Sequence, residues 1–183
     1  MRITTKENDI ESILYSEKQI AAMVETLGEK LTEDYAGKRP VMVCVLKGAS
    51  VFFTDLCREI DLNLDMDFIS VSSYGLSSKS SGVVKLNKDV DIDITGRDVI
   101  LVDDIIDSGL TLQHLKQLFS TRGPSSVKTI ALLDKKVRHD PALTPDYIGF
   151  QCPDHFVVGY GLDYANNYRN LPYIGILKQE VYK

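Results

Sequence analysis

The stretch that decides the fold is Val99–Leu112, which reads VILVDDIIDSGLTL. Four apolar residues run into two adjacent aspartates, and a third aspartate, a serine and a glycine then lead into another apolar segment. A short, continuously apolar run is typical of a strand that is buried on both faces of a parallel sheet. A turn that only ended such a strand would not need three acids, so the stretch predicts a binding site as well as a strand.

Buried strands and amphipathic helices alternate along the rest of the chain. A capping box formed by Ser16 and Gln19, with apolar residues at helical spacing after it, predicts a helix over 16–36. Apolar patterns also predict helices over 51–60 and 110–122. The predicted strands are 41–46, 64–73, 83–89, 99–102, 127–133, 147–150, 156–160 and 173–177. This alternation indicates an α/β fold in which helices flank a mainly parallel central sheet.

Length and composition limit the class of protein. A chain of 183 residues has the size of one domain, and 44% hydrophobic with 26% charged residues is typical of a soluble globular protein. No apolar run approaches the roughly 20 residues of a membrane span, and the N-terminus lacks the apolar core of a secretory signal. We therefore expect a cytoplasmic protein without a membrane partner.

The net charge of −5 argues against general binding to nucleic acid. The three unclustered cysteines argue against a disulfide framework or a zinc site.

Ligands of open α/β sheets bind beyond the carboxyl ends of the strands, where this chain carries acids and glycines. The segment Asp107–Thr111 would open a helix with hydroxyls and unpaired backbone N–H groups, which suit a phosphate. Taken alone, such a segment more often supplies an ordinary side-chain cap. Asp103 and Asp104, expected at the same crevice, repel each other unless cations or hydroxyl donors satisfy them. A ribose or a hydrated magnesium ion would do so, and the combination predicts a sugar phosphate as ligand.

Two other phosphate-binding patterns are missing from the sequence. The chain has no G-x-x-x-x-G-K-[ST] segment, which argues against a P-loop nucleoside triphosphatase. Gly159-Tyr160-Gly161 begins like a dinucleotide fingerprint, but Tyr164 stands where the third glycine would be. A Rossmann dinucleotide site is therefore not supported.

The segment VILVDDIIDSGLT resembles the motif that binds phosphoribosyl pyrophosphate in type I phosphoribosyltransferases. Four further segments resemble the hypoxanthine–guanine branch of that family and occur in the family order: LKG at 46–48, SYG at 73–75, LDKK at 133–136 and DHFVVGYGLDYANNYRNLPY at 154–173. Together the matches span about residues 40–177. The resemblance implies the type I phosphoribosyltransferase fold, with a single domain over 1–183 and a small hood subdomain formed by the N- and C-terminal segments.

The resemblance also implies an activity in purine salvage. Members of this branch transfer the phosphoribosyl group from phosphoribosyl pyrophosphate to hypoxanthine or guanine, giving IMP or GMP and pyrophosphate, with Mg²⁺ as cofactor. They often form a homodimer or homotetramer, which we expect here. A relative that prefers xanthine, and a regulator that keeps the fold but binds nucleic acid, are the alternatives. Asp107, Lys135 and the net negative charge argue against the regulator.

The matching positions carry implied roles, and Asp107 becomes the catalytic base near the purine. Lys135 would donate a hydrogen bond to the exocyclic oxygen of a 6-oxopurine. It has no acceptor atom for a hydrogen bond from the amino group of adenine. The implied sites are pyrophosphate at Lys47, Gly48 and Arg169; ribose and 5′-phosphate at Asp103, Asp104, Asp107, Ser108, Gly109, Leu110 and Thr111; purine at Lys135, Phe156, Val157 and Asp163; Mg²⁺ at Asp103, Asp104 and Asp163; and a lid at Ser73, Tyr74 and the polar loop 75–82.

Some of these positions also have ordinary structural explanations. Phe156 is expected to stack on the purine, although a single aromatic residue usually packs in a core. The family more often has glutamate as the first acid of the pair, so the shorter Asp103 would reach its metal or hydroxyl partner through a water molecule. We assign no catalytic role to the three histidines, His114, His139 and His155. We interpret the two cations near Lys135, which are Lys136 and Arg138, as solvated neighbours.

Overall fold

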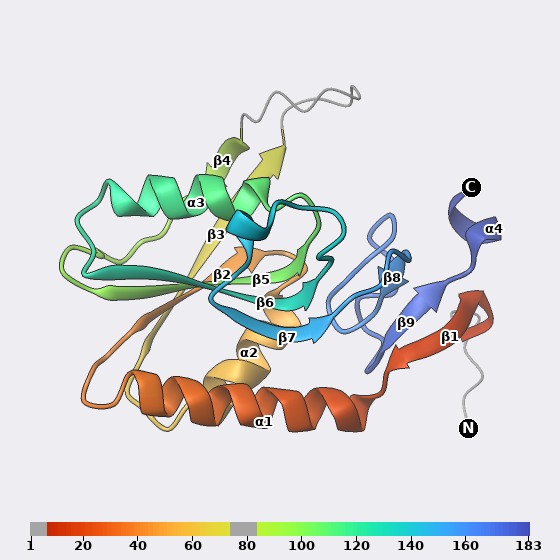
Figure 1. Ribbon diagram of the computed structural model, residues 1–183, viewed down its shortest axis with the longest axis horizontal. Coiled ribbons are helices and arrows are strands. Elements are labelled where there is room, and N and C mark those ends of the chain that lie inside the picture. Colours follow the sequence, from red (N-terminus) through yellow and green to blue (C-terminus); the bar gives the residue numbers. More distant parts are fainter. Residues whose placement is uncertain (1–6, 74–83) are drawn as a thin grey trace.

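The structure is a computed structural model that describes residues 7–73 and 84–183. Its main body is a six-stranded sheet formed by β2 (Val41–Leu46), β3 (Asp65–Ser73), β4 (Val84–Lys88), β5 (Asp98–Ile106), β6 (Ser126–Asp134) and β7 (Tyr147–Gln151). The strand order is β4-β3-β2-β5-β6-β7, and all neighbours are parallel except β4, which runs antiparallel to β3 at one edge. The predicted α/β class with a mainly parallel sheet is confirmed (Figure 1).

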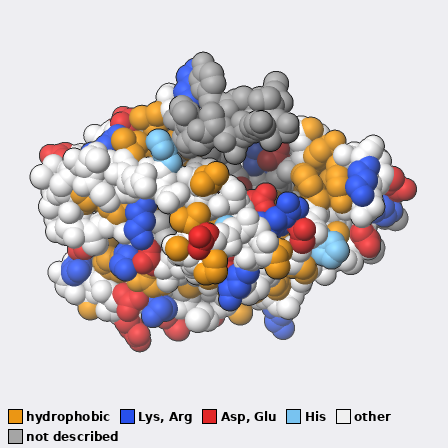
Figure 2. Space-filling model, turned by 45° about the horizontal axis from the view of Figure 1, so that its top comes forward, with side chains coloured by type: hydrophobic (Ala, Val, Ile, Leu, Met, Phe, Trp, Pro, Cys, Tyr) orange, Lys and Arg blue, Asp and Glu red, His pale blue; other side chains and the backbone are white. Residues whose placement is uncertain are grey.

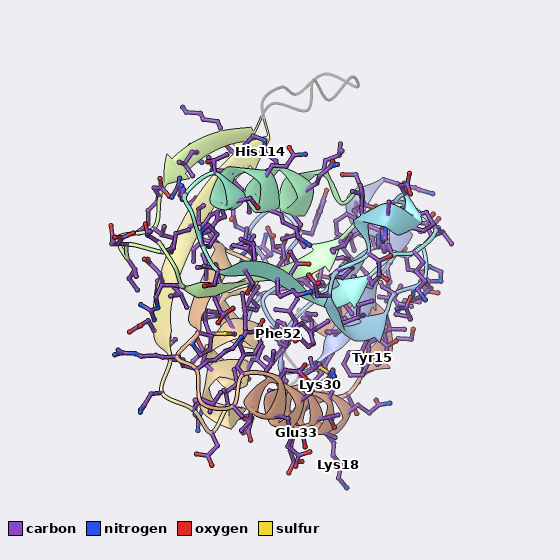
Figure 3. All side chains as sticks on the ribbon, turned by 60° about the vertical axis from the view of Figure 1, so that its left-hand side comes forward. Tyr15, Lys18, Lys30, Glu33, Phe52 and His114 are labelled. Atoms are coloured by element: carbon purple, nitrogen blue, oxygen red, sulfur yellow. The ribbon has the colours of Figure 1, made fainter. Side chains whose placement is uncertain are left out.

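Helices cover both faces of this sheet. Helices α1 (Glu17–Asp34) and α2 (Ser50–Glu59) lie on one face, and α3 (Leu110–Ser120) lies on the other (Figure 1). In Figure 3, Phe52 of α2 lies between the sheet and α1, whereas Glu33 projects from α1 away from the sheet. Within residues 7–73 and 84–183, no helix has the length and apolar character that a bilayer span requires.

The core is divided by the central strands, whose successive side chains point to opposite faces. Met42 and Ile100 belong to the cluster under α1 and α2, while their neighbours Val43 and Leu101 belong to the cluster under α3. All four side chains are 0% exposed. Because helices cover both faces of the sheet, the central strands consist of continuous apolar runs in the sequence.

A second, antiparallel sheet lies at one end of the molecule. It consists of β1 (Ile10–Tyr15), β9 (Ile174–Leu177) and β8 (Val157–Val158), in the order β1-β9-β8. Val158 and Leu177 of this sheet form a third apolar cluster with Tyr168 and Leu171, whereas Val157 and Ile174 belong to the cluster under α1 and α2. The short helix α4 (Gln179–Tyr182) follows β9. Figure 1 shows that this sheet brings the N-terminal and C-terminal segments side by side.

Apart from β5, every predicted helix and strand in the described residues occurs within two residues of its expected limits. The prediction that β5 ends at Val102 is wrong, because its pairing with β6 continues through Ile106 opposite Asp134. Strand β1 was not predicted, since its pattern of buried and exposed residues is irregular. Two 3₁₀ turns complete the described elements, at Glu7–Asp9 and Pro141–Leu143.

Candidate active site

The two adjacent aspartates lie near the carboxyl end of β5, and the second of them contacts a glycine in the loop after β2. Asp103 accepts a hydrogen bond from the backbone N–H of Asp104 at 3.0 Å, and Asp104 accepts one from Ile105 at 2.7 Å. The backbone of Gly48 packs against Asp104 so closely that a Cβ at Gly48 would overlap its Oδ2 atom. Only glycine fits at position 48 without displacing this carboxylate.

The turn that contains this glycine follows β2 and begins with an unusual peptide bond. The Leu46–Lys47 bond is cis, Lys47 is exposed and Gly48 is buried. The carbonyl of Lys47 accepts a hydrogen bond from the N–H of Ser50 at 3.1 Å, which joins the turn to the start of α2. The turn therefore holds an exposed cation and a buried glycine beside the acid pair.

Burial raises the pKa of both aspartates. The pKa of Asp103 lies well above its ordinary value, first because the side chain has lost water and second because Asp104 is negatively charged nearby. Loss of water also raises the pKa of Asp104, although the positive charge of Arg169 opposes the shift. Two buried carboxylates repel each other when both are ionised, so a cation or hydroxyl donors would stabilise the ionised pair.

The turn between β5 and α3 presents backbone N–H groups to a pocket of about 300 Å³. The N-cap of α3 is Gly109, whose φ of 75° lies in the left-handed region and which has no side chain to cap the first turn. Ser108 accepts a hydrogen bond of 3.5 Å from the N–H of Leu110, which is long for such a bond. The first turn of α3 is thus open to an anion. The pocket is lined by Asp103, Asp104, Asp107, Ser108, Gly109 and Thr111 together with apolar neighbours.

Neighbouring strand ends bring Asp107 and Lys135 together. Ile106 of β5 pairs with Asp134 of β6, and the N–H of Lys135 donates to the carbonyl of Ile106 at 3.0 Å. Asp107 and Lys135 are the next residues on these two parallel strands. Both line a second pocket of about 190 Å³, to which the predicted purine-binding residues Phe156, Val157 and Asp163 also contribute.

The two pockets share one wall. Asp104, Ile105 and Asp107 line both of them, and the side chain of Asp107 is 60% exposed. A ligand with a phosphate at one end and a flat ring at the other would span this wall. The structure thus gathers the phosphate-binding and ring-binding candidates on adjoining surfaces.

The segment after β8 folds back onto the turn at Gly48. The carbonyl of Gly48 leaves no space for a Cβ at Gly161, whose φ is 102°. Arg169 donates to the carbonyl of Gly161 at 2.7 Å and forms an ion pair of 2.7 Å with Asp163. These contacts bring Arg169 and Asp163 to the site of the buried acids.

Comparison with known proteins agrees with this geometry. A sequence model of the phosphoribosyl transferase domain family matches residues 11–165. The chain belongs to this phosphoribosyltransferase family. The hypoxanthine-guanine phosphoribosyltransferase of Streptococcus thermophilus is 51% identical over 176 residues, which cover 96% of this chain and 98% of that protein. A hypoxanthine phosphoribosyltransferase structure from Staphylococcus aureus matches with a TM-score of 0.96 and 42% identity over 100% of both chains.

Some relatives carry a segment similar to this chain as part of a longer protein. The bifunctional protein TilS/HprT of Listeria innocua is 53% identical over 175 residues, but the match covers only 27% of its length. The matched part covers 96% of this chain. The family resemblance stated from the sequence motifs is confirmed by all of these matches.

The acids of this phosphoribosyltransferase are of a kind that could bind a magnesium ion together with a phosphorylated ligand. Among residues 7–73 and 84–183, no group of three or more His, Cys, Asp or Glu side chains could hold a metal ion. Mg²⁺ usually binds proteins through one or two carboxylates and fills its remaining positions with water and substrate phosphates. Asp103 and Asp104 can supply those carboxylates, while Asp163 is already paired with Arg169. Mg²⁺ binding at these residues stays a prediction.

Arg138 belongs to the site although the sequence left it without a role. It pairs with Asp154 at 2.8 Å, and its Nε atom lies 3.8 Å from Oδ1 of Asp107. Arg138 is exposed, in agreement with its interpretation as a solvated neighbour, and the structure adds these two contacts. No local sequence signal marks it, because the contact depends on how the loop after β6 folds over the end of β5.

His139 is a second residue whose surroundings the sequence did not reveal. Its side chain is only 1% exposed, and its Nε2 atom lies 2.5 Å from Oδ1 of Asp134, which is 0% exposed. A hydrogen bond to the Asp140 carbonyl and the contact with Asp134 raise the pKa of His139. Asp134 directly precedes Lys135, so this buried pair anchors the loop that carries the predicted purine-binding lysine.

The remaining predicted residues fall into two groups. Ser73 is the last residue of β3, and Tyr74 and the segment 75–82 lie outside the described residues, so the lid stays a prediction. His114 lies on α3 (Figure 3), and His155 is exposed and does not line the second pocket. The structure thus gives no reason to add either histidine to the site.

Proposed function

We propose that this phosphoribosyltransferase makes IMP and GMP by transferring the phosphoribosyl group of phosphoribosyl pyrophosphate to hypoxanthine or guanine. The observation that carries this proposal is the wall of Asp104, Ile105 and Asp107 between the two pockets. A ribose against this wall has its phosphate on the α3 side and its base on the Lys135 side. The names of the relatives described above point to the same reaction.

The turn between β5 and α3 holds the sugar phosphate in this proposal. Backbone N–H groups and hydroxyls of Ser108, Gly109, Leu110 and Thr111 bind the 5′-phosphate, and the positive end of the helix dipole favours its charge. Asp103 and Asp104 accept hydrogen bonds from the ribose hydroxyls. Those donors satisfy carboxylates whose pKa values are raised by burial in the free protein.

The second pocket holds the purine. Lys135 donates to the exocyclic 6-oxygen, Phe156 stacks on the ring and the backbone of Val157 meets its edge. Asp107 lines both pockets and accepts the proton from the purine ring nitrogen as the new carbon–nitrogen bond forms. Arg138, at 3.8 Å from Asp107, places a positive charge beside this carboxylate.

The third group of residues stabilises the leaving pyrophosphate. Lys47 and Arg169 supply positive charge, and Gly48 allows the backbone to approach the oxygens closely. When bound, Mg²⁺ neutralises the pyrophosphate charge, with Asp103, Asp104 and Asp163 as the nearby carboxylates. Closure of a lid that includes Ser73 and Tyr74 would exclude water from the activated sugar.

We also propose the setting in which this reaction takes place. Residues 1–183 form one phosphoribosyltransferase domain, in which the small β1-β9-β8 sheet is the hood. The protein works in the cytoplasm as a homodimer or homotetramer. A nucleic-acid-binding regulator is not favoured, because Figure 2 shows basic side chains interspersed with acidic ones over the face in view.

Product formation from each purine tests the proposed function. The purified protein is incubated with phosphoribosyl pyrophosphate, Mg²⁺ and hypoxanthine, guanine, xanthine or adenine in turn. We expect IMP and GMP to form readily and adenine to give no appreciable product. Preferential turnover of xanthine would identify the xanthine-preferring relative, and the absence of turnover with all four bases would contradict the proposal.

A further inference from the structure

Three aromatic rings meet beside the proposed purine pocket. Tyr182, in the short C-terminal helix α4, stacks on Phe156 with 4.9 Å between ring centroids and 27° between ring planes. Tyr164 meets Phe156 edge-on, at 5.6 Å and 90°, and meets Tyr182 at 6.4 Å and 64°. Phe156 is thus held by two other rings, one of which comes from the end of the chain.

The rings differ in how they relate to the pocket. Phe156 lines the purine pocket, but neither Tyr182 nor Tyr164 is among the described residues that line it. Tyr182 therefore stacks on a pocket-lining ring without lining the pocket itself. Phe156 is still 36% exposed, so packing in the core does not fix its orientation.

Helix α4 is anchored by contacts that do not involve the Tyr182 ring. The N–H of Lys178 donates to the carbonyl of Asp9 at 3.0 Å, which ties the helix start to the N-terminal segment. The N–H of Leu177 donates to the carbonyl of Phe156 at 2.9 Å. The C-terminal segment is thus joined to the backbone of Phe156 directly. These backbone contacts do not involve the Tyr182 side chain, which also packs on the third apolar cluster.

We propose that Tyr182 is a positioning residue for the purine: it holds the ring of Phe156 in the orientation that stacks on the base. This inference rests on the proposed function and extends the purine site to the C-terminal helix. A ring that is oriented before the purine arrives loses less conformational freedom on binding, which favours affinity for the base. Because Tyr182 touches no reacting atom, it affects purine binding and leaves the chemical step unchanged.

Steady-state kinetics of the full-length protein test this role. Hypoxanthine is varied at saturating phosphoribosyl pyrophosphate, and the reverse, for wild type and for Tyr182→Ala and Tyr182→Phe. We expect Tyr182→Ala to raise the KM for hypoxanthine by about 2- to 10-fold, the range measured for aromatic pairs. The KM for phosphoribosyl pyrophosphate and kcat should stay within about twofold, and Tyr182→Phe should restore the wild-type KM because it keeps the ring.

Two further variants separate positioning from general packing. Val181→Ala removes an apolar side chain of the same helix that packs on the third cluster, and it should behave like wild type. In a Phe156→Leu background, Tyr182→Ala should have no additional effect, since the ring that it positions is gone. Thermal unfolding of each variant shows whether the fold is retained.

Three results would overturn the inference. An unchanged KM for hypoxanthine in Tyr182→Ala would mean that the stacking contact does not assist binding, and a lower KM would mean that Tyr182 obstructs the base. Equal increases in both KM values, with a lowered unfolding temperature, would indicate a structural role only. Failure of the proposed function is recognised separately, because wild type itself would then form no nucleotide from any purine.

Discussion

The backbone of Gly48 and the carboxylate of Asp104 lie in direct contact, although 55 residues, including helix α2 and strands β3 and β4, separate them in the sequence. A side chain at position 48 would occupy the space of Asp104 Oδ2, and the Gly48 carbonyl in turn excludes a side chain at Gly161. The contact between Gly48 and Asp104 therefore fixes the position of the proposed pyrophosphate-binding turn relative to the proposed ribose-binding acid.

Gly48→Ala should impair catalysis much more than stability. The added methyl group would displace the Asp104 carboxylate, and a misplacement of about 1 Å can cost about 10²-fold in rate. The measurement is kcat/KM for phosphoribosyl pyrophosphate. Gly37→Ala is the control: its φ of 74° also favours glycine, but no atom lies within 4 Å of the added Cβ. That variant should lose about 1 kcal/mol of stability and keep its activity. Wild-type kcat/KM in Gly48→Ala would refute the steric account.

Asp107→Asn should lower kcat by ~10²–10⁴-fold, because the amide cannot accept the purine proton. Binding of phosphoribosyl pyrophosphate, measured by calorimetry, should change little, since the backbone N–H groups of the turn remain. Asp91→Asn is a matched control, as its side chain is 86% exposed in an ion pair with Lys88. Unchanged turnover in Asp107→Asn would remove this residue from the role of base.

Lys135→Ala should weaken the binding of IMP by about 10- to 100-fold, the usual cost of losing a hydrogen bond from a charged donor. Its effect on phosphoribosyl pyrophosphate should be small, because Lys135 lines only the purine pocket of the two. The exposed neighbour Lys136 offers the control variant Lys136→Ala. Equal losses for both ligands would mean that Lys135 does not recognise the base.

The buried pair of His139 and Asp134 should make stability depend on pH. Contacts with the Asp140 carbonyl and with Asp134 raise the pKa of His139 in the folded protein. Stabilisation by the pair is therefore complete below about pH 6.5, the ordinary pKa of histidine, and is lost as pH rises through the raised value. We expect His139→Asn to lower the free energy of unfolding by about 3 kcal/mol at pH 6.

Urea unfolding of wild type and His139→Asn at pH 6 and pH 9 measures this dependence. The difference between the two proteins should shrink at the higher pH, because wild-type His139 has then lost its proton. His114→Asn is the control, since His114 is only partly buried on α3. A difference that is the same at both pH values would show that the pair contributes a hydrogen bond without its charge.

Much of the main sheet could be predicted because its strands carry a strong local pattern. Val41–Leu46 and the apolar start of β5 are covered by helices on both faces, so they appear as continuous apolar runs. Strand β1 has no such pattern: Ile13 is 56% exposed. It pairs with β9 near the other end of the chain, and a long-range pairing of this kind leaves little trace in local sequence.

The candidate site could be predicted where its residues are contiguous, as in the turn from Asp107 to Thr111. The proximity of Asp107 and Lys135 depends on the register of β5 and β6, which the sequence does not state. The contacts of His139 with Asp134 and of Arg138 with Asp107 depend on the path of one loop. Such contacts arise from tertiary packing, so no spacing rule could have predicted them.

A crystal structure of the protein with IMP tests the central claim most directly, because the claim concerns where one phosphate binds. The account predicts that the 5′-phosphate lies within hydrogen-bonding distance of the backbone N–H groups of Gly109, Leu110 and Thr111, with the ribose hydroxyls at Asp103 and Asp104. A phosphate bound away from the first turn of α3 would contradict the account.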